Sequence, residues 1–171
     1  MKIFKEIMSY VVIVLVVILI RFFIVTPVKV DGSSMYPTLK NNDILIEKKY
    51  DKSIERFDVV VIKYKKNKLV KRVIGMPGET VRISITRVGS NVVSKILING
   101  EVIDEDYGFE SIHDAGIASS EVKLGDDEYF VLGDNRNNSS DSRFIGVINK
   151  ENIDGVTSFR LFPFKNFGKF E

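Results

Sequence analysis

The sequence predicts a mostly β protein in which a single N-terminal transmembrane helix precedes an antiparallel, multi-sheet β-domain. Residues 7–25 form an almost uninterrupted apolar run. After Pro27 the pattern changes to short runs rich in Val, Ile, Tyr and Phe, separated by turn residues. In this later part only residues 149–153 suggest a helix, and that helix would be a single turn. The 171 residues suffice for one domain with an appendage.

Composition excludes several classes of site. The net charge is only +2, whereas broad nucleic-acid binding needs a concentrated basic face. The absence of Cys excludes disulfides, thiolate metal sites and cysteine nucleophiles. His113 is the only histidine, so a metal site built on several imidazoles is impossible. We therefore expect no cofactor, no metal and no nucleic-acid partner.

The apolar run at residues 7–25 is predicted to be a membrane anchor. As a helix it would be about 28 Å long, close to the ~30 Å hydrocarbon core of a bilayer. A cleaved signal peptide is the alternative, because Lys2 and Lys5 precede the run. However, bulky residues rather than a small-x-small cleavage site follow it. We expect residues 1–6 to be a short cytoplasmic N-terminus, although Arg21 and Lys29 weaken the charge asymmetry that would set this orientation.

Residues 31–39 follow the anchor and contain the candidate nucleophile, Ser34. Gly32 permits backbone angles that other residues avoid, and Pro37 fixes its own φ, so the turn can hold a serine side chain in a set direction. A free hydroxyl is a weak nucleophile at neutral pH and needs a base. The remainder of the chain, residues 26–171, must supply that base.

Alternating apolar runs predict the strands of the β-domain, and Asn99-Gly100 suits a type I′ hairpin turn between two strands. The acidic stretch 104–125 is predicted to be a surface excursion. The predicted strands are residues 44–48, 59–64, 69–74, 81–86, 92–98, 129–132 and 157–162.

Lys71 is the preferred candidate base. His113 lies in a loop context, and Ser-Lys pairs are a known variant of the catalytic triad. Strand alternation places Lys71 on one face with Leu69 and Val73, and Arg72 on the other. Alternation does not decide which of the two basic side chains faces a site, and a lysine on an edge strand fits the pattern equally well. A second pair, Ser120 and Lys123, has S-x-x-K spacing but lacks the companion motifs of that chemistry.

The polar cluster at residues 133–146 follows an apolar strand directly. Asp134 and Asp141 bracket Arg143, which predicts fork-like paired hydrogen bonds between these groups. Ser139 or Ser142 is placed to hold a neutral lysine amine. A solvated loop and a calcium loop are the alternatives, but the remaining positions of a calcium loop are missing.

Four segments, in order after the anchor, resemble those of bacterial type I signal peptidases, and the resemblance covers nearly the whole chain. The segments are Ser34-Met35-Tyr36-Pro37-Thr38-Leu39, Asp43-Ile44-Leu45-Ile46-Glu47-Lys48, Lys71-Arg72-Val73-Ile74-Gly75-Met76-Pro77-Gly78-Glu79 and Gly133-Asp134-Asn135-Arg136-Asn137-Asn138-Ser139-Ser140-Asp141-Ser142-Arg143.

The resemblance implies a serine endopeptidase that removes signal peptides from secreted preproteins, cutting after small residues at positions −3 and −1. It implies Ser34 as nucleophile, Lys71 as general base and Ser139 as the hydroxyl that orients Lys71. Gly32 occupies a position where some members carry an oxyanion-binding serine. The structural supports would be Asp134, Asp141 and Arg143.

The resemblance also implies a single-pass protein of the cell membrane, with its catalytic domain on the extracytoplasmic face. Its partners would be signal peptides, the lipid bilayer and the protein translocation machinery. Two alternatives are a membrane-anchored, non-catalytic β binding domain and a self-cleaving Ser-Lys protein. The apolar residues expected to line the substrate pockets are Val28, Val30, Met35, Leu39, Leu45 and Val70.

Overall fold

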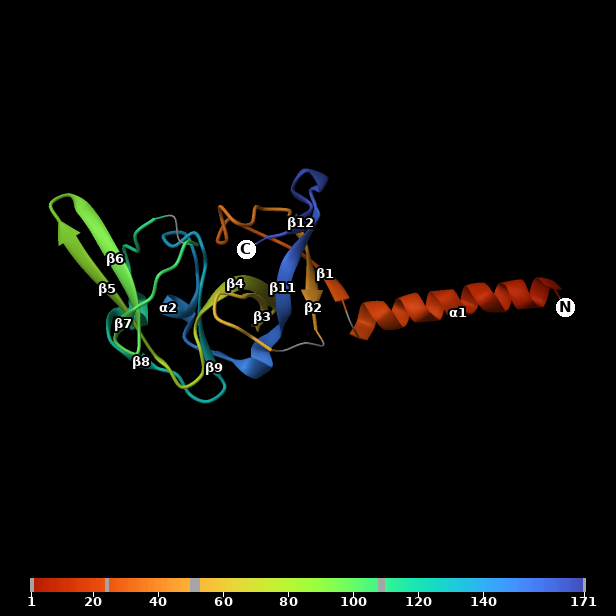
Figure 1. The fold of residues 1–171 in the computed structure, drawn as a ribbon, viewed down its shortest axis with the longest axis horizontal. Coiled ribbons are helices and arrows are strands. Elements are labelled where there is room, and N and C mark those ends of the chain that lie inside the picture. Colours follow the sequence, from red (N-terminus) through yellow and green to blue (C-terminus); the bar gives the residue numbers. More distant parts are fainter. Residues whose placement is uncertain (1, 24, 50–52, 108–109, 171) are drawn as a thin grey trace.

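The predicted β class is confirmed in the computed structural model, which describes residues 2–23, 25–49, 53–107 and 110–170. The strand pairs are antiparallel. A long helix, α1 (Lys2–Phe23), projects from one end of the β-domain, and the β5–β6 hairpin lies at the opposite end (Figure 1). Within the described residues, no helix combines the length and apolar character that a membrane crossing requires.

The larger sheet runs in the order β1-β2-β11-β3-β4-β9-β10, with β12 paired to β11. It curves, because Val28 of β1 and Val70 of β4 share one buried apolar cluster although three strands, β2, β11 and β3, lie between β1 and β4 in the sheet order. Its strands are β1 (Val25–Lys29), β2 (Ile44–Lys48), β3 (Val59–Tyr64), β4 (Asn67–Gly75), β9 (Glu128–Leu132), β10 (Ile148–Asn149), β11 (Ile153–Phe162) and β12 (Gly168–Lys169).

The smaller sheet runs in the order β7-β6-β5-β8 and packs on a second apolar cluster that includes Phe130 and Leu132 of β9. Asn99 and Gly100, which connect β6 to β7, both have positive φ, so the predicted hairpin turn is confirmed. The strands of this sheet are β5 (Thr80–Val88), β6 (Asn91–Ile98), β7 (Glu101–Val102) and β8 (Val122–Lys123).

The structure corrects several boundaries. Val25, predicted as the last residue of the anchor, begins strand β1, and Ile24 lies outside the described residues. Pro27 is tolerated in β1 because that strand lies at the edge of the sheet and pairs only with β2 among the described strands. Strand β11 begins four residues before the predicted start at Thr157, because Ile153 also pairs with β3.

Two segments are more ordered than predicted. The 104–125 stretch is not a simple surface excursion, because Ile112, Ala118 and Leu124 are buried beneath the smaller sheet. The polar cluster contains a one-turn helix, α2 (Ser142–Ile145), whose N-terminus is capped by Asp141. Short 3₁₀ turns also occur at Gly116–Ser119, Lys150–Asn152 and Phe164–Asn166, and the second confirms the turn predicted at 149–153.

Candidate active site

Ser34 and Lys71, 37 residues apart in sequence, meet at one hydrogen bond. The Ser34 Oγ and Lys71 Nζ atoms are 2.6 Å apart, and Lys71 Nζ also donates to the Val70 carbonyl at 3.0 Å. Ser34 is half-buried, whereas Lys71 is only 2% exposed. The hydroxyl is therefore reachable from solvent while the amine that contacts it is enclosed by protein.

The loop that presents Ser34 connects β1 to β2 and is closed at its base by backbone hydrogen bonds. Val30 N–H donates to the Asp43 carbonyl at 2.8 Å. Within the loop, Leu39 N–H donates to the Met35 carbonyl at 2.8 Å, and both side chains are buried. Gly32 has φ of +96°, a conformation that favours glycine, and its N–H donates to Asn41 Oδ1 at 2.9 Å. These contacts anchor the turn that carries Ser34.

Burial changes the acid–base character of Lys71. Removing the ammonium from water lowers the pKa of Lys71 from 10.5 to about 8. The negative charges of Asp141 and Asp134 act in the opposite direction, but burial dominates. A substantial fraction of the Lys71 amine is therefore neutral near pH 8, and only the neutral amine can accept a proton from Ser34.

Arg72, the neighbour of Lys71, has a different partner. Its Nε and Nη2 atoms donate to Asp134 at 2.9 and 2.8 Å, and both side chains are buried. The Thr38 hydroxyl donates to the same carboxylate at 2.6 Å. Asp134 thus connects the strand that carries Lys71 to the loop that carries Ser34. This corrects the prediction that Asp134 and Asp141 both bracket Arg143.

Asp141 does form the predicted fork with Arg143. The Arg143 Nε and Nη2 atoms each lie 2.8 Å from the Asp141 carboxylate, and both residues are buried. Asp141 also accepts the Gly133 N–H at 3.0 Å, and Arg143 Nη2 donates to the Arg136 carbonyl at 2.6 Å. The pair therefore determines the path of the loop at residues 133–143, beside Ser34.

Gly133 and Asn135 hold that loop against the nucleophile, and the sequence patterns did not assign them a role. Asn135 N–H donates to the Ser34 carbonyl at 3.0 Å. A Cβ at Gly133 would overlap both the Ser34 carbonyl oxygen and Ser139 Oγ. Ser139 therefore lies close to the Ser34 backbone. Its hydroxyl is buried and makes no hydrogen bond within the described residues, so its role in orienting Lys71 stays a prediction.

Ser33 is held from the same loop. Asn138 Nδ2 donates to Ser33 Oγ at 3.0 Å, and Asn135 Nδ2 donates to the Ser33 carbonyl at 3.1 Å. The residue before the nucleophile is thus clamped by two amides. The spacing of the asparagines in the sequence did not reveal this, because both partners lie more than 100 residues away.

The six apolar residues expected at substrate pockets lie in one cluster, together with Val59 and Val61. All six are buried. Two of them, Met35 and Val70, are the direct neighbours of Ser34 and Lys71 in the chain, so the cluster includes residues of the loop and the strand that carry the pair; that these residues line a substrate pocket stays a prediction. The six are Val28, Val30, Met35, Leu39, Leu45 and Val70.

The alternative candidates for the base and the nucleophile, His113 and the Ser120–Lys123 pair, are surface residues. His113 is exposed in the 104–125 stretch, where its backbone N–H donates to Asn137 Oδ1 at 3.0 Å. Ser120 and Lys123 are exposed as well, and the Ser120 hydroxyl is 3.4 Å from the Ile117 carbonyl. Neither burial nor a neighbouring base sets these groups apart from ordinary surface residues.

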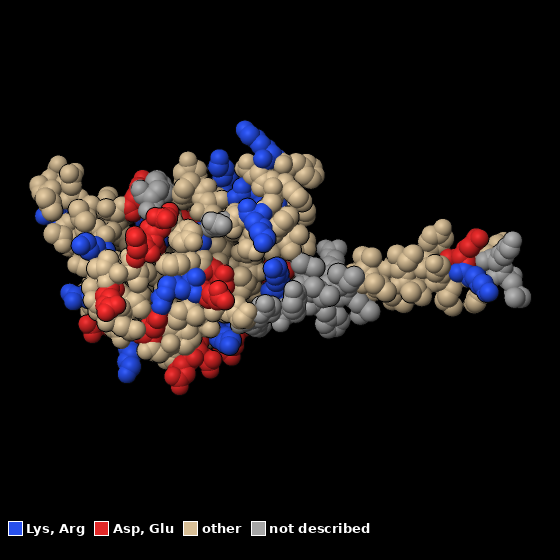
Figure 2. Space-filling model, viewed as in Figure 1, with Lys and Arg blue, Asp and Glu red and all other residues tan. Residues whose placement is uncertain are grey.

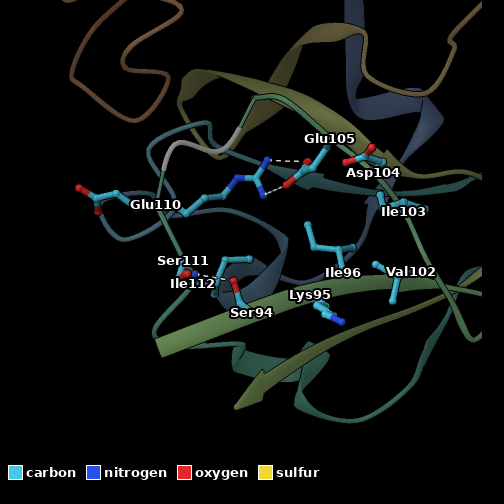
Figure 3. A pocket seen from close by; sticks show the side chains of 11 residues that line it. Ser94, Lys95, Ile96, Val102, Ile103, Asp104, Glu105, Glu110, Ser111 and Ile112 are labelled. Carbon is cyan, nitrogen blue, oxygen red and sulfur yellow. Dashed lines mark hydrogen bonds and ion pairs between the residues drawn. The ribbon is translucent and has the colours of Figure 1, made fainter. Parts of the chain in front are cut away.

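A polar pocket of about 360 Å³ lies between the β6–β7 region and the 103–112 stretch, and is separate from the Ser34–Lys71 pair (Figure 3). In the figure, dashed lines join Glu105 to an unlabelled guanidinium; the partner of Glu105 is Arg136, whose Nη2 donates to Glu105 at 2.8 Å. Arg136 is buried, and its Nε donates to the Gly133 carbonyl at 3.0 Å. The ion pair therefore contacts the 133–143 loop at Gly133.

This chain is similar to known proteins over most of its length. A family model described as signal peptidase, peptidase S26, matches residues 3–162. Signal peptidase I S of Bacillus subtilis (strain 168) is 37% identical, over 94% of this chain and 90% of that protein. Signal peptidase I T of the same organism is 39% identical, over 91% of this chain and 83% of that protein.

Among solved structures, a signal peptidase I from Enterococcus faecalis V583 is 29% identical to this chain. The match covers 61% of this chain and 96% of that chain, with a TM-score of 0.44. The family model and the Bacillus relatives each extend over most of the chain. The chain therefore belongs to the signal peptidase family, peptidase S26.

Proposed function

We propose that this chain is a membrane-anchored signal peptidase I, a serine endopeptidase that removes signal peptides from secretory preproteins by a Ser34–Lys71 dyad. The observation that carries the proposal is the 2.6 Å contact between Ser34 Oγ and a lysine amine that is 2% exposed. A buried amine with a pKa of about 8 can act as a base at a pH where ordinary lysines are charged.

The reaction is an acyl transfer in two stages. Lys71 Nζ accepts the Ser34 proton as Ser34 Oγ attacks the peptide carbonyl, and the resulting ammonium protonates the leaving amine. The neutral amine then removes a proton from the water that hydrolyses the acyl-enzyme, and that proton returns to Ser34. The Ser34 backbone N–H is the expected oxyanion donor, because Gly32 offers no side-chain hydroxyl.

The supporting residues hold the two reacting groups at this distance. Asp134, through Arg72 and Thr38, connects the strand of the base to the loop of the nucleophile. Asp141 and Arg143 set the path of the 133–143 loop. We assign Ser139 to holding the Lys71 amine, because its hydroxyl is buried close to Ser34.

The substrate is proposed to bind as an extended strand between residues 28–31 and residues 69–71. Strand β4 pairs with β9 only from Arg72 onward within the described residues, and β1 is an edge strand. Both edges therefore offer backbone groups for β-augmentation. The apolar cluster beneath them would receive small side chains such as Ala at positions −1 and −3.

The test is cleavage of a preprotein that carries Ala at positions −3 and −1, measured as a function of pH. Because protonated Lys71 cannot act as a base, kcat/KM should fall about tenfold per pH unit below pH 8 and level off above it. The matched control is the same preprotein with Leu at −1, which should resist cleavage. A rate that does not decrease toward acid pH would exclude a neutral-lysine base.

We further propose that residues 7–25, most of which belong to α1, are the anchor, that residues 1–6 are cytoplasmic, and that the β-domain lies outside, where preproteins leave the translocation machinery. The side chains of residues 3–18 are exposed on α1 and mostly apolar, and Figure 2 shows charge on its described part only near the N-terminal end. The chain has no Cys, so single cysteines introduced at Lys2 and Lys123 provide a direct test. In intact cells, a thiol reagent that does not cross the membrane should label the cysteine at position 123 and not the cysteine at position 2. Labelling of position 2 alone would indicate the opposite orientation.

A further inference from the structure

Strand β11 directs one arginine, Arg160, toward the nucleophile loop. Irregularities in the β11–β2 pairing lie on both sides of it, between Thr157 and Phe159 and between Arg160 and Phe162. Bulges of this kind re-aim side chains. Arg160 is consequently buried, whereas Leu161 and Phe162 are exposed. A strand that contributes no predicted site residue thus inserts a charged group beneath the site.

The Arg160 guanidinium contacts the nucleophile loop at two points. Its Nη2 donates to the Thr38 carbonyl, and its Nε forms an ion pair with Asp43 Oδ2 at 2.9 Å, although this Nε makes no hydrogen bond within the described residues. Asp43 is also buried and accepts the Lys40 N–H at 3.0 Å. The ring of Phe170 lies 5.7 Å from the guanidinium carbon on the remaining side. Arg160 therefore connects the half of the loop that follows Ser34 to strand β11.

Thr38 is the point where this contact meets the catalytic groups. Its carbonyl accepts from Arg160, and its hydroxyl donates to Asp134 at 2.6 Å. Asp134 is held by Arg72, the neighbour of Lys71. A displacement of Thr38 would therefore move the Ser34 turn relative to the strand that carries the base.

We propose that Arg160 is a positioning residue that sets the Ser34–Lys71 distance through Thr38 and Asp43. This inference rests on the proposed peptidase function. This role requires the planar guanidinium of arginine. One guanidinium reaches both the Thr38 carbonyl and the Asp43 carboxylate, whereas the compact ammonium of lysine cannot contact both groups in the same way. Misplacement of a reacting group by about 1 Å can cost about 10²-fold in rate.

The test is Arg160→Lys, which retains the charge opposite buried Asp43. We expect kcat to fall about 10²-fold with KM changed less than about threefold, because the chemical step and not substrate binding depends on the dyad distance. The position of the acid limb of the pH profile should stay unchanged. Amide hydrogen exchange should accelerate in a peptide covering residues 33–43 and nowhere in β5 or β6.

Arg56→Lys is the matched control. The Arg56 guanidinium likewise donates to a carbonyl and to a carboxylate: Nη1 donates to the Ile74 carbonyl at 2.6 Å, and Nη2 donates to Glu79 at 2.6 Å. Neither partner belongs to the nucleophile loop. Its kcat should stay within about twofold of wild type. If Arg160→Lys does not fold, the double variant Asp43→Asn/Arg160→Gln is used in its place. This variant leaves no buried charge at either position, because both partners of the ion pair become neutral amides. We expect its kcat to fall about 10²-fold as well.

The outcomes separate the two proposals. If the wild-type chain does not cleave preproteins, the proposed function fails while the hydrogen-exchange comparison still tests the loop contact. If wild type cleaves and Arg160→Lys retains its kcat, Arg160 does not position the dyad. A variant that loses thermal stability but keeps wild-type kcat below its melting temperature would assign Arg160 a structural role only and overturn the inference.

Discussion

Lys71→Met should reduce the rate of preprotein cleavage about 10⁴-fold, the upper range for loss of a general acid–base group. Methionine approximates the length of lysine and suits a site that is 2% exposed, so packing should be retained while the amine is lost. The Ser34 hydroxyl, 2.6 Å from Lys71 Nζ in the wild type, would then have no base. Single-turnover cleavage of a preprotein measures this loss.

Further variants show whether a loss of activity in Lys71→Met reflects the loss of a dyad. Ser34→Ala should lose as much activity, and Ser34→Ala combined with Lys71→Met should lose no more than either alone, because the two groups act as a unit. Lys66→Met, at an exposed position close to the same strand, is the control and should retain activity. Substantial cleavage by Lys71→Met would show that another group accepts the Ser34 proton.

The second large effect is expected from Gly133→Ala. The added methyl group would overlap the Ser34 carbonyl oxygen and Ser139 Oγ, and would lie 2.7 Å from Ser139 Cβ. The backbone of the nucleophile would have to shift, and we expect kcat to fall at least about 10²-fold. Overpacking of this kind also costs about 1–3 kcal/mol of stability. Circular dichroism melting and the cleavage assay measure the two effects separately.

Gly125→Ala is the control for Gly133→Ala. A methyl group there meets only the flexible end of Glu128, 3.3 Å away, in an exposed turn. Its activity and melting temperature should match wild type. If Gly133→Ala remained fully active, the 133–143 loop would not need its close approach to Ser34, and the role we assign to that loop would be wrong.

Most of the β-domain could be predicted from local patterns. The limits of β2 and β3 agree with the predicted runs at 44–48 and 59–64, because each strand is paired along its whole length by a regular neighbour, β1 for β2 and β4 for β3. The predicted strand ranges do not include the two-residue strands β7, β8, β10 and β12, since two residues carry no periodicity. Ile112, Ala118 and Leu124 were placed on the surface because buried residues in an irregular segment leave no repeating pattern.

Sequence motifs identified the candidate residues of the site, but they did not identify all of the residues to which these candidates hydrogen-bond. Ser34, Lys71, Asp134, Asp141 and Arg143 were all named from the sequence. The fork of Asp141 with Arg143 is local and was foreseen. The partner of Asp134 was not, because Arg72 lies 62 residues earlier and strand pairing, which the sequence does not specify, brings the two together.

The sequence by itself determined the antiparallel β class, the apolar N-terminal run and the identity of the candidate nucleophile and base. Only the tertiary structure decided that Lys71 rather than Arg72 meets Ser34, and that Arg160 reaches the same loop from strand β11. The physical reason is that alternation assigns a residue to a face of its own strand. The curvature of the sheet and the register of its strands then decide which distant loop that face meets.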